Sequence, residues 1–136
     1  MTRADTQDPL IGSELADRYR IVRRIGTGGM GSVYEALHLR TGRVLAIKTI
    51  SDELLDSSEA LRRFRREAGI IGRLNHPNIV EIIDWDQLDN GAPCMVMELL
   101  RGESLNRLIK RVGPLPWDTI ALVADQLCSA LSVAHQ

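Results

Sequence analysis

The fold of this chain is decided by one stretch, Ile25-Gly26-Thr27-Gly28-Gly29-Met30-Gly31-Ser32-Val33. Three of its glycines stand in a Gly-x-Gly-x-x-Gly frame, and a valine follows two places after the last of them. Because glycine has no Cβ, such a loop can turn tightly and bring backbone N–H groups close to phosphate oxygens. The pattern alone fits three structures: a dinucleotide-binding turn that opens a helix, a loop that folds over a nucleotide, or a flexible hairpin tip.

The segments on both sides of the glycines favour strands. Residues 19–25 precede the loop with a strand-like pattern, and residues 32–40 run on to the turn signal Thr41-Gly42. Residues 43–50 are then rich in β-branched and aliphatic side chains. A dinucleotide-binding turn needs a helix after the glycines, so the order strand, loop, strand, turn, strand indicates an antiparallel meander instead. Tight, stoichiometric binding of NADH would support the dinucleotide alternative.

The chain resembles a known family at two motifs. The frame Gly26-x-Gly28-x-x-Gly31-x-Val33, followed by Ala46-Ile47-Lys48, is similar to the first two elements of the protein kinase signature. The sequence from Gly28 to Tyr34 looks most like that of the eukaryotic-like serine/threonine kinases of bacteria. The resemblance implies an α+β fold, with an amino-terminal lobe of five antiparallel strands and one helix, then a hinge and the first helices of a truncated carboxy-terminal lobe.

This resemblance divides the chain into three parts. We expect residues 1–18 to be a flexible leader, 19–97 the ATP-binding lobe, and 98–136 the hinge with the start of the truncated second lobe. The leader is polar and shows no sustained period, although Ile11 and Leu15 could dock on the first strand.

Lys48 is the candidate phosphate ligand. On an extended strand Val44, Ala46 and Lys48 share one face, because side chains alternate with period two. If that face lines a cleft, Ala46 leaves room for a flat base, Val33 closes over it, and Lys48 reaches the phosphates. The alternative is an edge-strand lysine left in solvent, as most lysines are.

Glu67 is the candidate partner of Lys48. Residues 59–74 are predicted to form a helix behind the N-cap candidates Ser57 and Ser58. Its apolar stripe consists of Phe64, Ile70, Ile71 and Leu74. Glu67 lies within this stripe, and a carboxylate on a buried face needs a partner. In the kinase family a helix glutamate pairs with the strand lysine, and the pair must form for activity. The alternative is that Glu67 lies at the margin of the stripe and pairs with Arg63.

The segment Met97-Glu98-Leu99-Leu100 falls where the family joins its two lobes. By resemblance Met97 would control access to the back of the pocket, and the Glu98 carbonyl and Leu100 N–H would face the adenine. A buried strand end fits the same composition. The ATP-binding residues that the resemblance implies are therefore Ile25, Gly26, Thr27, Gly28, Gly29, Met30, Gly31, Ser32, Val33, Ala46, Lys48, Glu67, Met97, Glu98 and Leu100.

The residues that perform phosphoryl transfer in the family have no counterpart here. Neither the His-Arg-Asp catalytic loop nor the Asp-Phe-Gly metal-binding segment occurs in the sequence, so we predict no catalytic residue and no metal ligand. The complete enzyme would use ATP and Mg²⁺ to phosphorylate serine or threonine of a protein, whereas this chain alone is expected to be inactive. The alternative is a non-catalytic, pseudokinase-like binding or regulatory module. Its partner surface would be the apolar face of the helix predicted at Trp117 to His135.

Length and composition limit the classes of protein to which this chain can belong. The chain has 136 residues, about one domain by size, and a net charge of -1 that gives no reason to invoke nucleic acid or an anionic membrane. No apolar run approaches the roughly 18 residues of a membrane span, and no signal peptide is recognisable, so we expect a cytoplasmic protein. The two cysteines, Cys94 and Cys128, are predicted to be reduced core residues.

Overall fold

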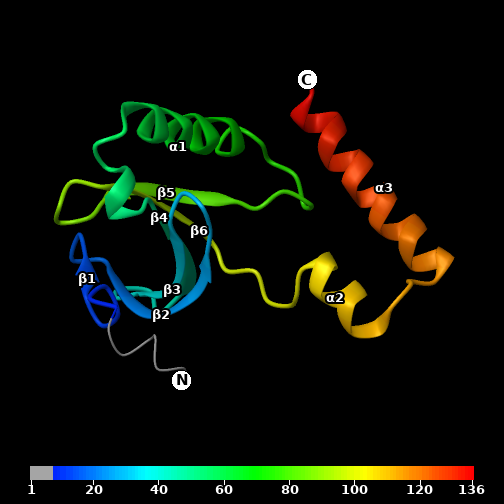
Figure 1. Ribbon diagram of the computed structural model, residues 1–136, viewed down its shortest axis with the longest axis horizontal. Helices are drawn as coiled ribbons and strands as arrows, with labels where there is room; N and C mark the ends of the chain where they lie inside the picture. The colour runs from blue at the N-terminus through cyan, green and yellow to red at the C-terminus, as the bar shows by residue number, and fades with distance from the viewer. Residues whose placement is uncertain (1–7) are drawn as a thin grey trace.

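A computed structural model describes residues 8–136 of the chain. Its centre is a curled antiparallel sheet of six strands in the order β1-β2-β3-β4-β6-β5, with one long helix beside it and two further helices beyond the last strand (Figure 1). The strands are β1 (Glu14–Leu15), β2 (Tyr19–Thr27), β3 (Ser32–His38), β4 (Val44–Thr49), β5 (Ile82–Gln87) and β6 (Pro93–Glu98). The helices are the 3-10 turn η2 (Asp52–Leu54), α1 (Ser58–Ile71), α2 (Leu105–Val112) and α3 (Trp117–Ala134).

The strand register sorts the side chains of β4 between the two faces of the sheet. Val33 of β3 lies opposite Lys48, and Ala46 lies opposite Met97 of β6. Since directly opposed residues point to the same face, these side chains share one side. Leu45 and Ile47 alternate with them and are buried in the core. The sequence expectation for the faces of this strand is therefore met.

Helix α1 begins after an N-cap serine and packs against the core through a narrow apolar edge. The Ser57 hydroxyl accepts a hydrogen bond from the Ala60 N–H at 3.2 Å, which satisfies one free donor of the first turn. Phe64 is fully buried, and its ring lies 5.5 Å from that of Trp85. The expected stripe was wrong at Ile70, which is 50% exposed, because the buried edge runs through Phe64 and Ala68 instead.

Residues 8–18 differ from the expected flexible leader, and residues 1–7 of that leader lie outside the described part. β1 pairs with β2, and Leu15 stands opposite Tyr19. Leu15 is buried, and Leu10 and Ile11 pack against the core. These apolar side chains gain burial on the sheet, so the segment adds a sixth strand to the five that the sequence predicts.

Two polar contacts hold this segment and the start of β2 in place. The Tyr34 hydroxyl donates to Asp8 Oδ2 at 2.8 Å, and the Arg24 guanidinium lies 3.4 Å from the same oxygen. Arg18 bridges Asp84 and Asp86 of β5 at 3.1 and 2.5 Å. This second contact, the Arg18 clasp, joins the start of β2 to a strand at the far end of the sheet order, which closes the curl.

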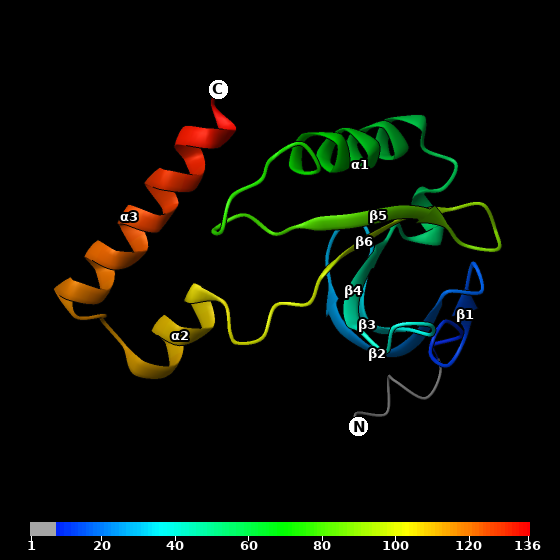
Figure 2. The ribbon, with the colours of Figure 1, turned by 180° about the vertical axis from the view of Figure 1, so that it is seen from behind.

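Helices α2 and α3 lie to one side of the sheet in both views (Figure 2). The Ser104 hydroxyl caps α2 by accepting from the Arg107 N–H, and Gly113, with φ of 78°, ends it in a conformation that favours glycine. His76, before β5, bonds through Nε2 to Ser129 Oγ of α3 at 2.8 Å. None of the helices within residues 8–136 combines the length and the apolar character of a membrane span.

The two cysteines differ in environment. Cys94 is buried in the core as predicted, and burial raises the pKa of its thiol to about 12. The prediction for Cys128 was wrong, because this residue lies on an exposed part of α3. The same helix leaves Ile120, Leu127 and Leu131 between 40% and 55% exposed. Apolar periodicity therefore identifies the face of a helix that another element can cover, but it does not show that such an element is present.

Phe64→Ala should lower the free energy of unfolding by about 3–5 kcal/mol, because it removes a fully buried ring and leaves a cavity. Urea unfolding followed by circular dichroism measures this. Ile70→Ala on the same helix is the matched control and should change stability by less than about 0.5 kcal/mol. Equal losses in the two variants would contradict the observed orientation of α1.

The alkaline titration of Tyr34 should report its contact with Asp8. Burial, and then the Asp8 hydrogen bond, raise the pKa of Tyr34 to about 12. A pKa raised in the folded state contributes stability that is present below about pH 10 and lost as the pH rises toward 12. In a titration of phenolate absorbance, Asp8→Asn should lower the Tyr34 midpoint, whereas Glu14→Gln should not. A midpoint that Asp8→Asn leaves unchanged would refute the contact.

Candidate functional site

A cavity of ≈ 400 Å³ lies beneath the glycine loop that joins β2 to β3. Its eight lining residues all belong to the predicted ATP-binding set: Gly26, Thr27, Gly28, Gly29, Met30, Gly31, Val33 and Lys48. Because Val33 and Lys48 are directly opposed in the sheet, the valine methyls and the lysine ammonium reach the same cavity. Because β2 and β3 pair on both sides of the glycines, the loop is the tip of a hairpin and not the start of a helix.

The backbone of the glycine loop presents hydrogen-bond donors. The loop is closed by a bond from the Gly28 N–H to the Gly31 carbonyl at 2.8 Å. Within residues 8–136, the N–H groups of Gly29, Met30 and Gly31 donate to no other group. Successive free N–H groups beside an ammonium form a site that suits a phosphate anion.

The far side of the loop rests on the turn after β4. A Cβ added to Gly31 would lie 1.9 Å from the Thr49 carbonyl oxygen, so only glycine fits there. The Ser51 N–H donates to the Met30 carbonyl at 2.8 Å. These contacts of Thr49 and Ser51 were missed in the sequence, and since they use backbone atoms no side-chain pattern could have revealed them.

Lys48 and Glu67 meet as the sequence predicts. Lys48 Nζ lies 3.0 Å from Glu67 Oε1, and no ion pair joins Glu67 to Arg63 among the described residues. The packing of Phe64 and Ala68 sets the rotation of α1 that turns Glu67 toward the sheet. The two side chains are 26% and 41% exposed, so the pair stabilises the fold by at most about 1 kcal/mol. Its main effect is to fix where the ammonium lies.

The other predicted residues lie outside the lining of this cavity. Ala46 and Met97 are opposed on β4 and β6, and Ala46 is buried. Glu98 bonds to Glu81 through both its N–H and its carboxylate, and Leu100 is 68% exposed after the end of β6. Ile25 is also exposed. The hinge roles of Met97, Glu98 and Leu100 thus stay predictions.

Ser32 lines a different cavity. It follows the glycine loop on β3, and its carbonyl accepts from the Thr49 hydroxyl at 3.3 Å. Its side chain belongs to a second cavity, on the outer side of the loop. Adjacent residues of a strand point to opposite faces, so Ser32 and Val33 cannot both face the same cavity.

The described residues hold no metal site of their own. Within residues 8–136 no group of three His, Cys, Asp or Glu side chains is placed to bind a metal ion. The donors beneath the loop are N–H groups and an ammonium, which bind anions. A nucleotide phosphate fits this donor set.

Comparison with known proteins identifies the family. The protein kinase domain family matches residues 19–136. Serine/threonine-protein kinase PknA of Mycobacterium tuberculosis is 40% identical over 131 residues, which cover 93% of this chain and 30% of PknA. Serine/threonine-protein kinase pkn3 of Myxococcus xanthus is 36% identical over 133 residues, which cover 98% of this chain and 24% of that kinase. The crystal structure of the M. tuberculosis PknI kinase domain aligns with a TM-score of 0.72 at 31% identity, over 92% of this chain and 51% of that domain.

The chain belongs to the protein kinase family and corresponds to the amino-terminal part of the kinase domain. Its bacterial serine/threonine kinase relatives confirm the predicted family, and the likeness to PknI confirms the predicted fold class. The chain spans about a quarter to a third of the length of the curated relatives named above. It spans about half of the PknI kinase domain.

Gly31→Ala should displace the glycine loop, because the new methyl group would overlap the Thr49 carbonyl. We expect a loss of about 1–3 kcal/mol in the free energy of unfolding, the range for overpacking, in urea denaturation. Gly29→Ala is the matched control, since a Cβ there meets nothing within 4 Å. If both variants were equally stable, Gly31 would not lie against β4 as described.

Proposed function

We propose that this chain is the ATP-binding part of a serine/threonine protein kinase whose complete form transfers the γ-phosphate of ATP to a protein hydroxyl. The observation that carries the proposal is the 3.0 Å ion pair between Lys48 and Glu67 beside the cavity of the glycine loop. In protein kinases the corresponding pair must be in place for activity. An anion site with a positioned ammonium is also what nucleotide phosphates require.

Each residue has a role in this proposal. The Lys48 ammonium contacts the phosphates, Glu67 orients it, and the free N–H groups of the loop donate to phosphate oxygens. Met97, Glu98 and Leu100 border the adenine. Mg²⁺, when bound in the complete enzyme, neutralises developing charge on the phosphates. We assign no catalytic base within residues 8–136, and we propose that this chain alone binds ATP without transferring phosphate.

A second candidate function, a non-catalytic binding module, is favoured by the exposed apolar face of α2 and α3. A groove of ≈ 340 Å³ lies between these helices, bordered by Leu105, Ile109, Ile120, Val123 and Leu127. In a complete kinase domain we propose that further segments of that domain cover this face. If a separate protein covers it instead, a stable complex should form whose affinity survives Lys48→Met.

Nucleotide titrations of the 136-residue chain test the proposal. With a fluorescent ATP analogue, Lys48→Met should weaken binding about tenfold or more, because a charge-assisted contact to phosphate is lost. Glu67→Gln should weaken it several-fold by releasing the lysine. Arg66→Gln, the neighbouring charge on α1, is the control and should bind as the unaltered chain does.

Equal affinity in the Lys48→Met variant and the unaltered chain would overturn the proposed function. Urea unfolding of each variant separates loss of binding from loss of fold. A parallel titration with NADH tests the dinucleotide alternative, since tight stoichiometric binding would favour that alternative over ATP.

A further inference from the structure

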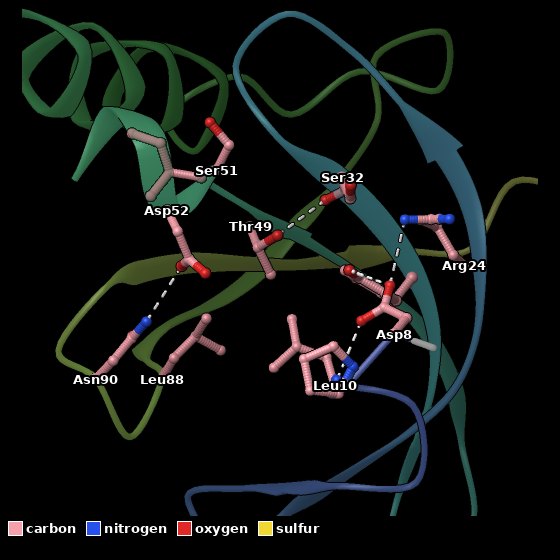
Figure 3. Close-up of a pocket in the computed structure, with 12 residues that line it drawn as sticks. Asp8, Leu10, Arg24, Ser32, Thr49, Ser51, Asp52, Leu88 and Asn90 are labelled. Carbon is pink, nitrogen blue, oxygen red and sulfur yellow. Dashed lines mark hydrogen bonds and ion pairs between the residues drawn. The ribbon is translucent and has the colours of Figure 1, made fainter. Parts of the chain in front are cut away.

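A second cavity, of ≈ 460 Å³, lies on the outer side of the glycine loop. We call it the outer cavity. Figure 3 shows Asp52 and Asn90 at one end and Asp8 with Arg24 at the other, with Thr49 and Ser32 between them. One wall, formed by residues 8–10, precedes the part of the chain that matches the kinase family, residues 19–136. The cavity therefore depends on a segment outside the family match.

The floor of the outer cavity is apolar. Ile50 and Leu88 are 2% and 7% exposed, and Leu10 packs against the core beside them. Three hydroxyl-bearing residues, Ser32, Thr49 and Ser51, also line the cavity. Small-molecule sites commonly are cavities of this volume that combine apolar lining residues with a few polar groups, which fix the orientation of the ligand.

The charges at the two ends are not equivalent. Asp8 at one end is held by the Tyr34 hydroxyl at 2.8 Å and by Arg24 at 3.4 Å, so its charge is already balanced. The Asp52 carboxylate at the other end accepts one hydrogen bond, from the Asn90 amide at 3.4 Å, and forms no ion pair with any described residue. Within residues 8–136 the exposed Asp52 carboxylate therefore has no cationic partner, which favours a cationic ligand.

The walls of the outer cavity also support the glycine loop. Ser51, which lines the cavity, donates its N–H to the Met30 carbonyl at 2.8 Å. Thr49, another lining residue, leaves no room for a side chain on Gly31 and bonds through its hydroxyl to the Ser32 carbonyl. A ligand that moves these two residues must therefore move the loop that covers the candidate nucleotide site.

We propose that the outer cavity binds a small organic monocation, with its charged group on Asp52 and its apolar body on Leu88, Ile50 and Leu10. Binding repositions Thr49 and Ser51 and so changes the position of the glycine loop and the affinity of the nucleotide site. The effect on nucleotide affinity rests on the proposed function, whereas the binding site itself does not.

The test uses benzamidine as the probe and two-dimensional amide NMR of the 136-residue chain. Saturable shifts are expected at Thr49, Ser51, Asp52 and Asn90, and also at Met30 and Gly31 of the loop. Benzamide has the same shape without the charge and should give no saturable shifts. Asp52→Asn should weaken benzamidine binding about fivefold or more, because a charge-assisted contact is lost. Glu53→Gln, one residue away and outside the lining, should leave it unchanged.

Shifts that do not saturate, that map elsewhere, or that Asp52→Asn leaves unaltered would overturn the site. Equal binding of benzamide would overturn the cation preference. Saturating benzamidine should change the affinity for the fluorescent ATP analogue about fivefold or more, in the usual range of coupling between sites. An unchanged affinity would overturn the coupling.

The Lys48→Met variant separates this proposal from the proposed function. If that variant binds no nucleotide but keeps the benzamidine shifts at Asp52 and Met30, the outer cavity stands by itself. If the unaltered chain binds no nucleotide, the proposed function fails, and the shifts at Met30 and Gly31 still decide whether the cavity moves the loop.

Discussion

The register between β3 and β4 is the constraint on which the rest of the structure depends. It sets Val33 opposite Lys48, and the same alternation sends Ser32 and Thr49 to the other side. Because the side-chain period of a strand is two, a slip of one residue would move the ammonium into the core and the core residues into the cavity. Leu45 and Ile47 are completely or almost completely buried, so the hydrophobic effect holds the register, and the register in turn places the charge.

The ion pair between Lys48 and Glu67 illustrates how a weak contact can be placed by a strong one. The partly exposed pair adds little to stability, whereas Phe64 anchors α1 from within the core. Because Glu67 lies three residues from Phe64, burial of the ring turns the carboxylate toward the sheet. A helix that rotated or withdrew would separate the two charges at small electrostatic cost. The packing of α1, and not the charge attraction, therefore decides whether the pair exists.

The sequence predicted the features that a local pattern encodes. Alternation and turn residues located β2, β3 and β4, and the meander distinguished the glycine loop from a dinucleotide turn. The predictions that were wrong concern features that depend on contacts with residues distant in the sequence. Ile70 was predicted to be buried from its helical spacing and Cys128 from the usual burial of cysteine, yet within residues 8–136 no neighbouring element covers either side chain. The folded segment 8–18 and the support of the loop by Ser51 rest on contacts between distant or backbone atoms, which composition and periodicity do not record.

The Arg18 clasp has a consequence for how the chain is made. Its partners Asp84 and Asp86 follow Arg18 by 66 and 68 residues, so the two halves of the contact leave the ribosome far apart in time. β1, the glycine hairpin and β4 are synthesised first and can pair locally, but the Arg18 guanidinium has no carboxylate of β5 to bind until that strand emerges. Contacts of such long separation form late, since the intervening loop must close first. The link between the start of β2 and β5, although one half of it is translated early, is thus among the last contacts of the sheet to form.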